Sequence, residues 1–255
     1  MSNYERNNAM VACIIAVLII GAVGVGALVW LGGTNWSGFG GPNWNTTTDF
    51  TFEEMESTMP DSVSLDVDLN AGELNIVFVD DSELLYRFDL EVPNRTISQH
   101  GNPSVSYSSD VIALDYAAAK ANLTLGSGTN YTMSFDVQAG GVQLTIGENA
   151  HVGDLNITTE AGGIDLTATD SAFYSGDVQF NLAASTGGIT MNVDLPSTIG
   201  GSFTGTTSLG GVDVSTSTWT QTSTGNYETS NYDTASQTVT ITATATLGGI
   251  QATLA

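Results

Sequence analysis

The sequence feature that most constrains the fold is a pair of adjacent glycines that recurs through the C-terminal half of the chain. The second glycines of the five pairs are separated by 22, 25, 23 and 38 residues. Glycine has no Cβ, so it accepts positive φ and lets another backbone approach closely. Near-equal steps therefore predict one corner repeated in register, with an insertion before the last corner. The pairs are Gly140-Gly141, Gly162-Gly163, Gly187-Gly188, Gly210-Gly211 and Gly248-Gly249.

Short runs of alternating apolar and polar residues flank these corners. In residues 62–69, which read SVSLDVDL, every second side chain is apolar, and a similar run over 74–78 follows the turn Asn70-Ala71-Gly72. A period of two is typical of a strand with one buried face. The helical period is absent after residue 31, except across 116–120, where an alanine run could form one turn. Strands joined through stacked corners predict an all-β, elongated β-solenoid, in which each coil buries its apolar face against the next.

Residues 9–31 form an apolar run of 23 residues without a charge. At about 1.5 Å per residue, a helix of this length spans about 34 Å, enough to cross a bilayer. Trp30 suits the interface, and Gly32-Gly33 would end the helix. A secretory signal peptide is the alternative, but its apolar region is normally about 7–15 residues long and follows a basic start. Here Arg6 is offset by Glu5, so we expect one retained transmembrane helix.

The expected organisation follows from this anchor. Arg6 and the terminal amine favour an N-terminus on the inner side, with the C-terminal domain outside a cell membrane that the chain crosses once. Residues 32–60 are rich in Gly, Asn and Thr and show no sustained period, which predicts a flexible stalk. The predicted parts are a short inner tail (1–8), the transmembrane helix (9–31), the stalk (32–60) and an extracytoplasmic β-solenoid domain (61–255).

Six Asn-x-Ser/Thr sequons lie beyond the anchor. They could accept N-linked glycans if the segment is exported in a host with the machinery. Several would arise by chance in a chain this rich in Ser and Thr, so they support an outside location only modestly. The six are Asn35, Asn45, Asn94, Asn122, Asn130 and Asn156.

The charge balance excludes one class of partner. The chain has 4 Lys and Arg against 27 Asp and Glu, a formal net charge of −23. Nucleic acids and anionic lipids both require a clustered basic surface, which four scattered bases do not provide. A solvated acidic surface is favoured over a specific cation site, with diffuse binding of divalent cations as the alternative. The four bases are Arg6, Arg87, Arg95 and Lys120.

The sequence offers no constellation for metal or nucleophilic chemistry. His100, His151 and Cys13 are isolated from one another, so we expect no transition-metal site. There is no Gly-x-Ser-x-Gly elbow for a serine nucleophile. Asp80-Asp81 and Asp165/Asp170 could supply oxygen ligands to Ca²⁺, but solvated acids are the preferred interpretation. We therefore predict no catalytic, cofactor-binding or metal residue and no cofactor.

A carbohydrate-active enzyme is the least favoured alternative. Asp165 and Asp213 follow equivalent corners and could stack on one face as a carboxylate pair, with Thr190 between them. A polyanionic glycan would also need bases, which residues 121–255 lack. Four aromatic residues could form a contact surface or pack loops: Phe173, Tyr174, Trp219 and Tyr227.

Residues 61–255 resemble the toast-rack domains (LiaF-like C-terminal domains) and the related "putative adhesin" repeat domains. The resemblance lies in the opening LDVDLNAGELNIVFVDD, the corner segments FDVQAGG, NITTEAGG and LAASTGG, and the ending NYETSNYDTASQTVTITATATLGGIQATLA. It implies a right-handed, single-coil β-solenoid on a membrane-tethered envelope protein, without catalytic residues. Some members restrain a histidine kinase of the envelope-stress response. Those usually carry several membrane helices, and the single helix here is closer to the adhesin type.

Together these observations favour a single-pass envelope protein that presents a non-enzymatic β-solenoid for scaffolding or envelope sensing. An adhesin-like or self-assembling surface module is the alternative, since a solenoid has open ends and edge strands that can pair. The expected partners are the membrane, through one helix, and an envelope protein or glycan. The sequence does not distinguish these partners, nor does it give the oligomeric state.

Overall fold

The computed structural model describes residues 43–255. The predicted transmembrane helix (9–31), Asn35 and the first part of the predicted stalk lie outside these residues. The described part is all-β, as predicted, with eighteen strands and one short helix, α2 (Asn94–His100). This helix, the one among residues 43–255, lacks the length and apolar character needed to cross a bilayer.

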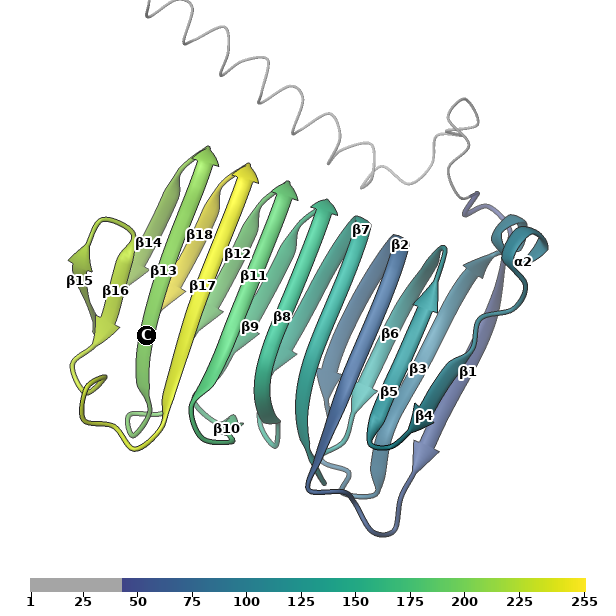
Figure 1. Cartoon of the computed structure of the whole chain (residues 1–255), viewed down its shortest axis with the longest axis horizontal. Helices are drawn as coiled ribbons and strands as arrows, with labels where there is room; N and C mark the ends of the chain where they lie inside the picture. The colour runs from purple at the N-terminus through teal and green to yellow at the C-terminus, as the bar shows by residue number, and fades with distance from the viewer. Residues whose placement is uncertain (1–42) are drawn as a thin grey trace, which may run out of the picture. The chain divides into compact units, whose positions relative to one another are not determined.

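Most strands belong to two facing rows in which neighbours run parallel (Figure 1). The chain passes up a strand of the first row, turns a corner and enters a strand of the second row; we call each such pass a coil. In spatial order, the first row contains β5 (Val111–Tyr116), β2 (Ser62–Phe78), β7 (Asn130–Ile146), β8 (His151–Ala161), β11 (Val178–Thr186), β17 (Thr238–Leu247) and β13 (Gly200–Leu209). The second row contains β6 (Ala119–Leu125), the later halves of β2 and β7, β9 (Ile164–Ala168), β12 (Ile189–Val193), β18 (Ile250–Leu254) and β14 (Val212–Thr216).

The coils are not stacked in chain order. The last coil, β17–β18, lies between β11–β12 and β13–β14, so that Ile250 pairs with Ile189 on one side and with Val212 on the other. The 38-residue interval before the last glycine pair therefore contains an extra segment, in which the chain passes beyond β13 and then returns to form β17. That segment contains the antiparallel hairpin β15 (Trp219–Ser223) and β16 (Asn226–Thr229), and β16 pairs with β13. At the other end, β2 similarly lies between β5–β6 and β7.

The core lies between the two rows and is built from the alternating apolar residues. Along one row of register, Leu144, Leu166, Met191 and Ala252 come from successive coils and are all buried. Full burial of an aliphatic side chain contributes about 1.5–3 kcal/mol, so the repeated pattern stabilises every coil through its neighbours. Thr159 is the exception in the first row, because its buried Oγ1 has no partner among the described residues.

The N-terminal end differs from the expected stalk. Residues 47–55, within the segment predicted to be flexible, form β1 (Thr47–Met55), which pairs antiparallel with β3 (Leu84–Pro93). Phe50 and Phe52 pack against the core, and this burial explains why the segment is ordered. Strand β3 continues the second row beyond β6, while β4 (Val105–Ser108) pairs with β5. The alanine run over 116–120 forms the corner between β5 and β6 rather than a helical turn.

Two turns at this end are made by short local interactions. Helix α2 begins after Pro93, and the N–H of Gly101 donates to the carbonyl of Ile97 at its end. Asp81 accepts hydrogen bonds from the N–H groups of Glu83 and Leu84, at 3.0 and 3.2 Å, before β3 begins. The Asp81 carboxylate, one of the candidate calcium ligands, is therefore engaged in a turn.

Candidate binding sites

The five glycine pairs lie at the corner between the two rows, and the two members of a pair have different surroundings. A Cβ on Gly162 would collide with the carbonyl oxygen of Gly140, and one on Gly187 would collide with that of Gly162. The same holds for Gly248 against Gly187 and for Gly210 against Gly248. The first glycines thus form one column in which each backbone touches the next. Gly72, which the sequence analysis assigned only to a turn, belongs to this column beside Ala119.

The second glycines are less constrained. A Cβ on Gly141 would lie 3.5 Å from the carbonyl oxygen of Gly163, and one on Gly163 would lie 3.5 Å from that of Gly188. These are ordinary van der Waals distances. At Gly211, in the outermost coil β13–β14, nothing lies within 4 Å of the added atom.

Asp165 and Asp213 do not form a carboxylate pair. They share a row of register on the exposed face, but Thr190 and Gln251 lie between them, because β12 and β18 separate β9 from β14. Three strand spacings amount to about 14 Å, beyond the roughly 5–9.5 Å that separate the carboxyls of glycosidases. The expectation that only Thr190 would lie between them is wrong, because the last coil inserts there. The pair therefore gives no support to a carbohydrate-active enzyme.

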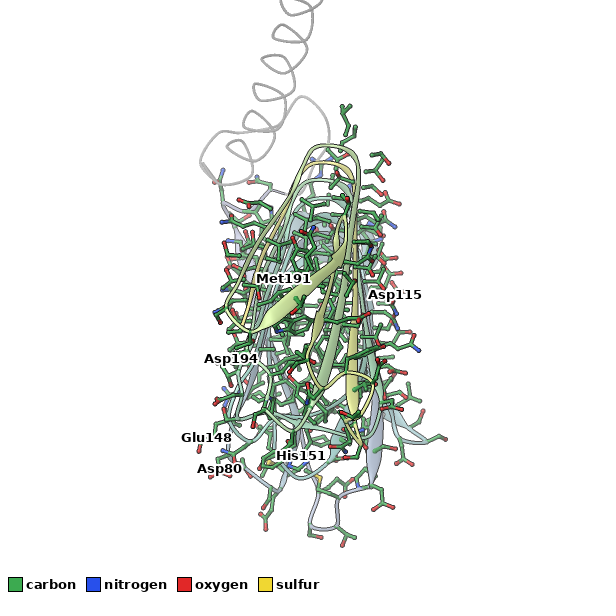
Figure 2. The ribbon with its side chains drawn as sticks, turned by 90° about the vertical axis from the view of Figure 1, so that its left-hand side faces the viewer. Asp80, Asp115, Glu148, His151, Met191 and Asp194 are labelled. Atoms are coloured by element: carbon green, nitrogen blue, oxygen red, sulfur yellow. The ribbon has the colours of Figure 1, made fainter. Side chains whose placement is uncertain are left out.

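Another acidic row does bring carboxylates together. Asp68 on β2 pairs with Asp115 on β5 and with Asp136 on β7, so three exposed aspartates lie side by side across neighbouring strands. Partial desolvation raises the pKa of Asp68, and the charges of Asp115, Asp136 and Asp66 raise it further. Figure 2 shows Asp115 on one side of the body and Asp80 and Glu148 near its lower edge. Within residues 43–255, no three acids, histidines or cysteines are arranged to hold a metal ion.

Four of the five described sequon asparagines lie on exposed positions. Asn122 Oδ1 accepts a hydrogen bond from Asn75 Nδ2 at 3.2 Å, and Asn156 Oδ1 accepts one from Asn181 Nδ2 at 3.0 Å. These amides bridge neighbouring coils whether or not they carry glycans. Four sequon asparagines are exposed and one is half-buried: Asn45, Asn94, Asn122 and Asn156, and Asn130 respectively.

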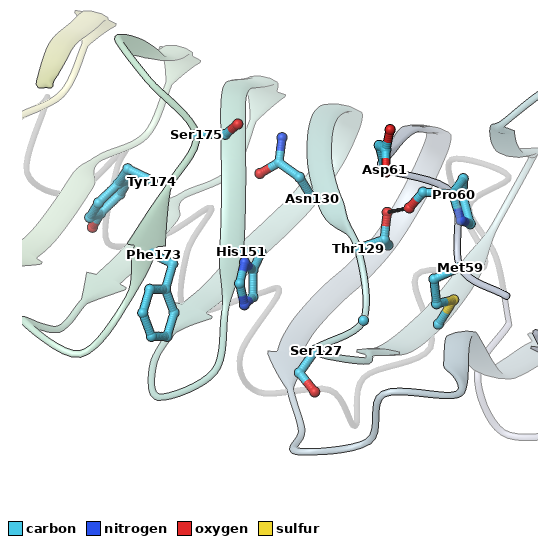
Figure 3. A pocket seen from close by; sticks show the side chains of 11 residues that line it. Met59, Pro60, Asp61, Ser127, Thr129, Asn130, His151, Phe173, Tyr174 and Ser175 are labelled. Carbon is cyan, nitrogen blue, oxygen red and sulfur yellow. Dashed lines mark hydrogen bonds between the residues drawn. The ribbon is translucent and has the colours of Figure 1, made fainter. Parts of the chain in front are cut away.

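A shallow furrow crosses the end of the coils opposite the glycine corners (Figure 3). Three adjacent strands of the first row, β2, β7 and β8, begin here, together with the short strand β10 (Phe173–Tyr174), which leads toward β11. The furrow has a volume of about 480 Å³. It is lined by Met59, Pro60, Asp61, Ser127, Gly128, Thr129, Asn130, His151, Phe173, Tyr174 and Ser175.

An aromatic platform forms one wall of the furrow. The rings of His151 and Phe173 are stacked, with centroids 4.8 Å apart and planes 16° from parallel. Phe173 is 55% exposed, whereas its neighbour Tyr174 points inward and is buried. The pairing of β10 with β8 places Phe173 directly opposite His151, which fixes the stack. An exposed ring supported by a second ring offers one free aromatic face to solvent.

Polar groups line the rest of the furrow. Thr129 Oγ1 donates to the carbonyl of Pro60 at 2.7 Å, which ties the loops before β7 and β2 together. Asn130 is half-buried, and its Oδ1 is buried without a hydrogen-bond partner among the described residues. Asp61 and Ser175 are exposed at the edge. The furrow thus combines an apolar face with an exposed hydroxyl and a carboxylate, and no Lys or Arg lines it.

These residues are predictable from the sequence only in part. The sequence presents His151 only as an isolated candidate metal ligand, and Phe173 and Tyr174 as residues of a contact surface or of loop packing. Phe173 does lie at the surface, but Tyr174 and Trp219 are buried and Tyr227 is half-buried against Phe203. The repeat interval does not indicate the stack, because His151 and Phe173 are 22 residues apart, whereas the glycine pairs of their two coils are 25 residues apart and β11 pairs with β8 at that larger offset. His100 lies at the end of α2, away from this furrow.

Comparison with known proteins supports the fold. No family model and no curated protein matches the sequence. A solved structure of a "putative cell adhesion protein" from Clostridium sporogenes matches with a TM-score of 0.66 and 15% identity, over 82% of this chain and 100% of that one. A "putative adhesin" from Bacteroides fragilis matches over 83% and 98% of the two chains at 11% identity, with a TM-score of 0.33. The first likeness shows a shared fold, whereas the second is too weak to support a conclusion.

Proposed function

We propose that this protein is a membrane-anchored, non-enzymatic surface module of the adhesin type. Residues 9–31 would anchor it in the cell membrane with the N-terminus inside, and the strands from residue 47 onward would lie outside. The coils would form a right-handed, single-coil β-solenoid of the toast-rack kind. The observation that carries the proposal is the fold likeness to the Clostridium sporogenes protein over that protein's whole length.

We prefer an adhesive function to scaffolding or envelope sensing, although the sequence alone favours the latter two. Two observations support this order. The fold likeness is to a protein whose description concerns cell adhesion. The exposed aromatic ring of Phe173 lies in a furrow lined by polar groups, which suits recognition of an external ligand better than a purely structural surface does.

The furrow is the recognition surface in this proposal, and its chemistry suits an uncharged glycan. Sugar rings pack their apolar C–H faces against aromatic rings and hydrogen-bond with surrounding polar groups. Phe173 supplies the ring, and the exposed side chains of Asp61 and Ser175 supply hydrogen-bonding groups for sugar hydroxyls. Asp61 and the absence of a lining Lys or Arg disfavour acidic glycans.

The test is binding of the detergent-solubilised full-length chain to surfaces coated with neutral or acidic oligosaccharides. Phe173→Ala is expected to weaken binding to neutral glycans by about tenfold, because it removes the stacking face. Leu247→Ala is the matched control: Leu247 is also exposed, at 43%, but lies at the glycine-corner end. Equal binding by both variants, or a preference for acidic glycans, would contradict this role of the furrow.

The expected topology has a separate test. Protease added to intact cells should digest the β-domain while the inner tail stays protected. A domain that becomes accessible only after lysis would contradict the outside location.

A further inference from the structure

The two rows end differently at the C-terminal end of the described body (Figure 1). The first row continues past β13 through β16 and β15. The second row stops at β14, which pairs with β18 alone. The first row therefore extends two strands beyond the second, and the outer edge of β14 is left without a strand partner in the described part of the chain.

The hydrogen bonds between coils show what this edge lacks. At the corner, the N–H of Val142 donates to the carbonyl of Gly163, that of Ile164 to Gly188, and that of Ile189 to Gly249, each at 3.0 Å. The N–H of Ile250 donates in the same way to Gly211, at 2.9 Å. Val212 pairs with Ile250 and occupies the next position of this register. Its N–H therefore points away from β18, to the place where a further coil would lie. Because alternate residues of a parallel strand face opposite neighbours, the N–H of Val214 faces the same way.

The side chains repeat this pattern. Ile164, Ile189 and Ile250 are each at most 2% exposed, because a coil lies on both sides of them. Val212 and Val214 occupy equivalent inward positions, yet both are only half-buried. The outermost coil, β13–β14, therefore presents both the backbone donors and the apolar surface that every inner coil uses to bind its neighbour.

We infer that β14 is a docking edge for an extended peptide segment of another protein, which adds to the second row as its next parallel strand. The overhang of β16 and β15 in the first row leaves a step about two strands, or roughly 10 Å, wide. A single strand fits this step, whereas a second copy of the coiled body would meet the hairpin. The backbone N–H and C=O groups of the peptide that face β14 would hydrogen-bond with the open edge of β14, as peptides do when they add a strand to other open sheet edges.

Charge defines the chemistry of this segment. Asp213 is the one charged residue of β14 and points outward, and residues 121–255 contain no Lys or Arg. The three bases among the described residues, Arg87, Arg95 and Lys120, all belong to the opposite end of the body, on β3, α2 and β6. The docking strand is therefore expected to alternate apolar residues, facing inward, with basic residues beside Asp213.

The probe is the peptide Gly-Gly-Ile-Lys-Ala-Lys-Leu. It keeps the glycine pair and the inward residues of β18, Ile250, Ala252 and Leu254, and carries lysine at the positions of Gln251 and Thr253. The control peptide has glutamate in place of both lysines. Binding of each fluorescently labelled peptide to the full-length chain in detergent is measured by anisotropy, and the protected amides are located by hydrogen exchange.

We expect saturable binding of the lysine peptide, about tenfold weaker binding of the glutamate peptide, and slower exchange at Val212 and Val214. Asp213→Lys should reverse the preference between the peptides. Val214→Pro should abolish binding, because it removes an outward N–H without removing a bond to β18; an unchanged circular dichroism spectrum checks its fold. Failure of both peptides to bind, unchanged affinity in Val214→Pro, or protection of the same amides by self-association alone would overturn the inference.

Discussion

The carbonyl oxygen of Gly140 occupies the space that a Cβ atom on Gly162 would need. The same relationship continues from Gly162 to Gly187 and from Gly187 to Gly248, so the corners of adjacent coils touch through their backbones. Gly187 also has a φ of 143°, which other residues rarely adopt. The column therefore sets how closely the coils approach, and the strand hydrogen bonds on both sides depend on that approach.

Gly162→Ala and Gly163→Ala are a matched pair that tests this column. Gly162→Ala forces one backbone away from the next, and we expect a loss of about 3 kcal/mol or more, because both neighbours are backbone atoms that cannot rotate aside. Gly163→Ala places its Cβ 3.5 Å from the carbonyl of Gly188, an ordinary contact, and should change stability by less than about 1 kcal/mol. Thermal melts would show the difference as roughly 6 °C or more. Equal losses in the two variants would show that the column is not the constraint.

The aspartate row on β5, β2 and β7 should lower stability at neutral pH. The folded-state pKa of Asp68 is raised above its ordinary value, by desolvation first and by Asp115, Asp136 and Asp66 next. A raised pKa means that the folded state binds this proton more tightly than the unfolded chain does. Ionisation of Asp68 therefore costs stability, fully above the folded-state pKa, and the cost diminishes as the pH falls below that pKa and is gone below the ordinary value of 3.8.

Asp68→Asn should accordingly raise the melting temperature at pH 7 by about 1–2 °C, a small gain because the row is exposed and screened. The gain should shrink at acidic pH and at high salt. Asp165→Asn is the control, since Asp165 has Gln143 and Thr190 as its strand neighbours and no acid beside it. A gain for Asp68→Asn that is independent of pH would point to a cause other than charge.

The local structure of the coils is predictable from the sequence, and their order is not. The glycine pairs and the period of two mark the corners and strands, because each depends on residues close in the chain. The stacking order depends on which coil faces which, and the coils carry nearly the same pattern. Nothing in Gly248-Gly249 or the following Ile250 shows that this coil inserts beside Ile189 rather than beyond Val212.

The candidate site was missed for a related reason. His151 and Phe173 are isolated from each other in the sequence. Taken alone, His151 is a possible metal ligand, and Phe173 is an aromatic residue of a contact surface or a loop. They meet because β10 pairs in parallel with β8 at an offset of 22 residues, three fewer than the 25 at which β11 pairs with β8. The repeat interval alone does not predict such a pair, because the residues between β10 and β11 change the offset. The order of the coils adds a second difficulty, since Asp213 pairs with Gln251 of the following coil and not with Thr190 of the preceding one.

The inserted last coil makes folding depend on the C-terminus. Loss of the end repeat in a simple stack removes one interface, but loss of β17–β18 separates β11–β12 from β13–β14 and leaves edges on both sides exposed. A chain that ends at Gln237 should therefore aggregate, which sedimentation would detect. A monomeric truncated protein with an intact circular dichroism spectrum would contradict this prediction.

A point substitution tests the same coil without truncation. Ala243 is fully buried on β17, whereas the adjacent Thr244 is exposed. Ala243→Asp places an unpaired carboxylate in the core and should lower stability by several kcal/mol, while Thr244→Asp should cost about 1 kcal/mol or less. Similar melting temperatures for the two variants would show that the coil is loosely held.

Two buried tyrosines should respond in opposite directions to loss of their hydroxyl group. Tyr131 Oη donates to the carbonyl of Leu85 at 2.6 Å, whereas the buried hydroxyl of Tyr174 has no partner among the described residues. Tyr131→Phe leaves a buried carbonyl unsatisfied and should cost about 1–3 kcal/mol. Tyr174→Phe removes an unpaired polar group and should raise stability by about 1 kcal/mol, measurable as a gain in melting temperature. Destabilisation by Tyr174→Phe would mean that its hydroxyl is paired in solution.

The same two residues predict how the fold responds to alkaline pH. Burial raises the pKa of both phenols above the ordinary value of 10.0. Below pH 10 the phenols are neutral in both the folded and the unfolded states, so their full contribution to the free energy of unfolding is retained. Above that pH the unfolded chain loses these protons while the folded chain retains them, so stability falls as the pH rises. Each of the variants Tyr131→Phe and Tyr174→Phe should make the decline in melting temperature between pH 10 and pH 11 less steep. An unchanged slope in both would show that the phenols ionise without unfolding, and hence that water reaches them in the folded state.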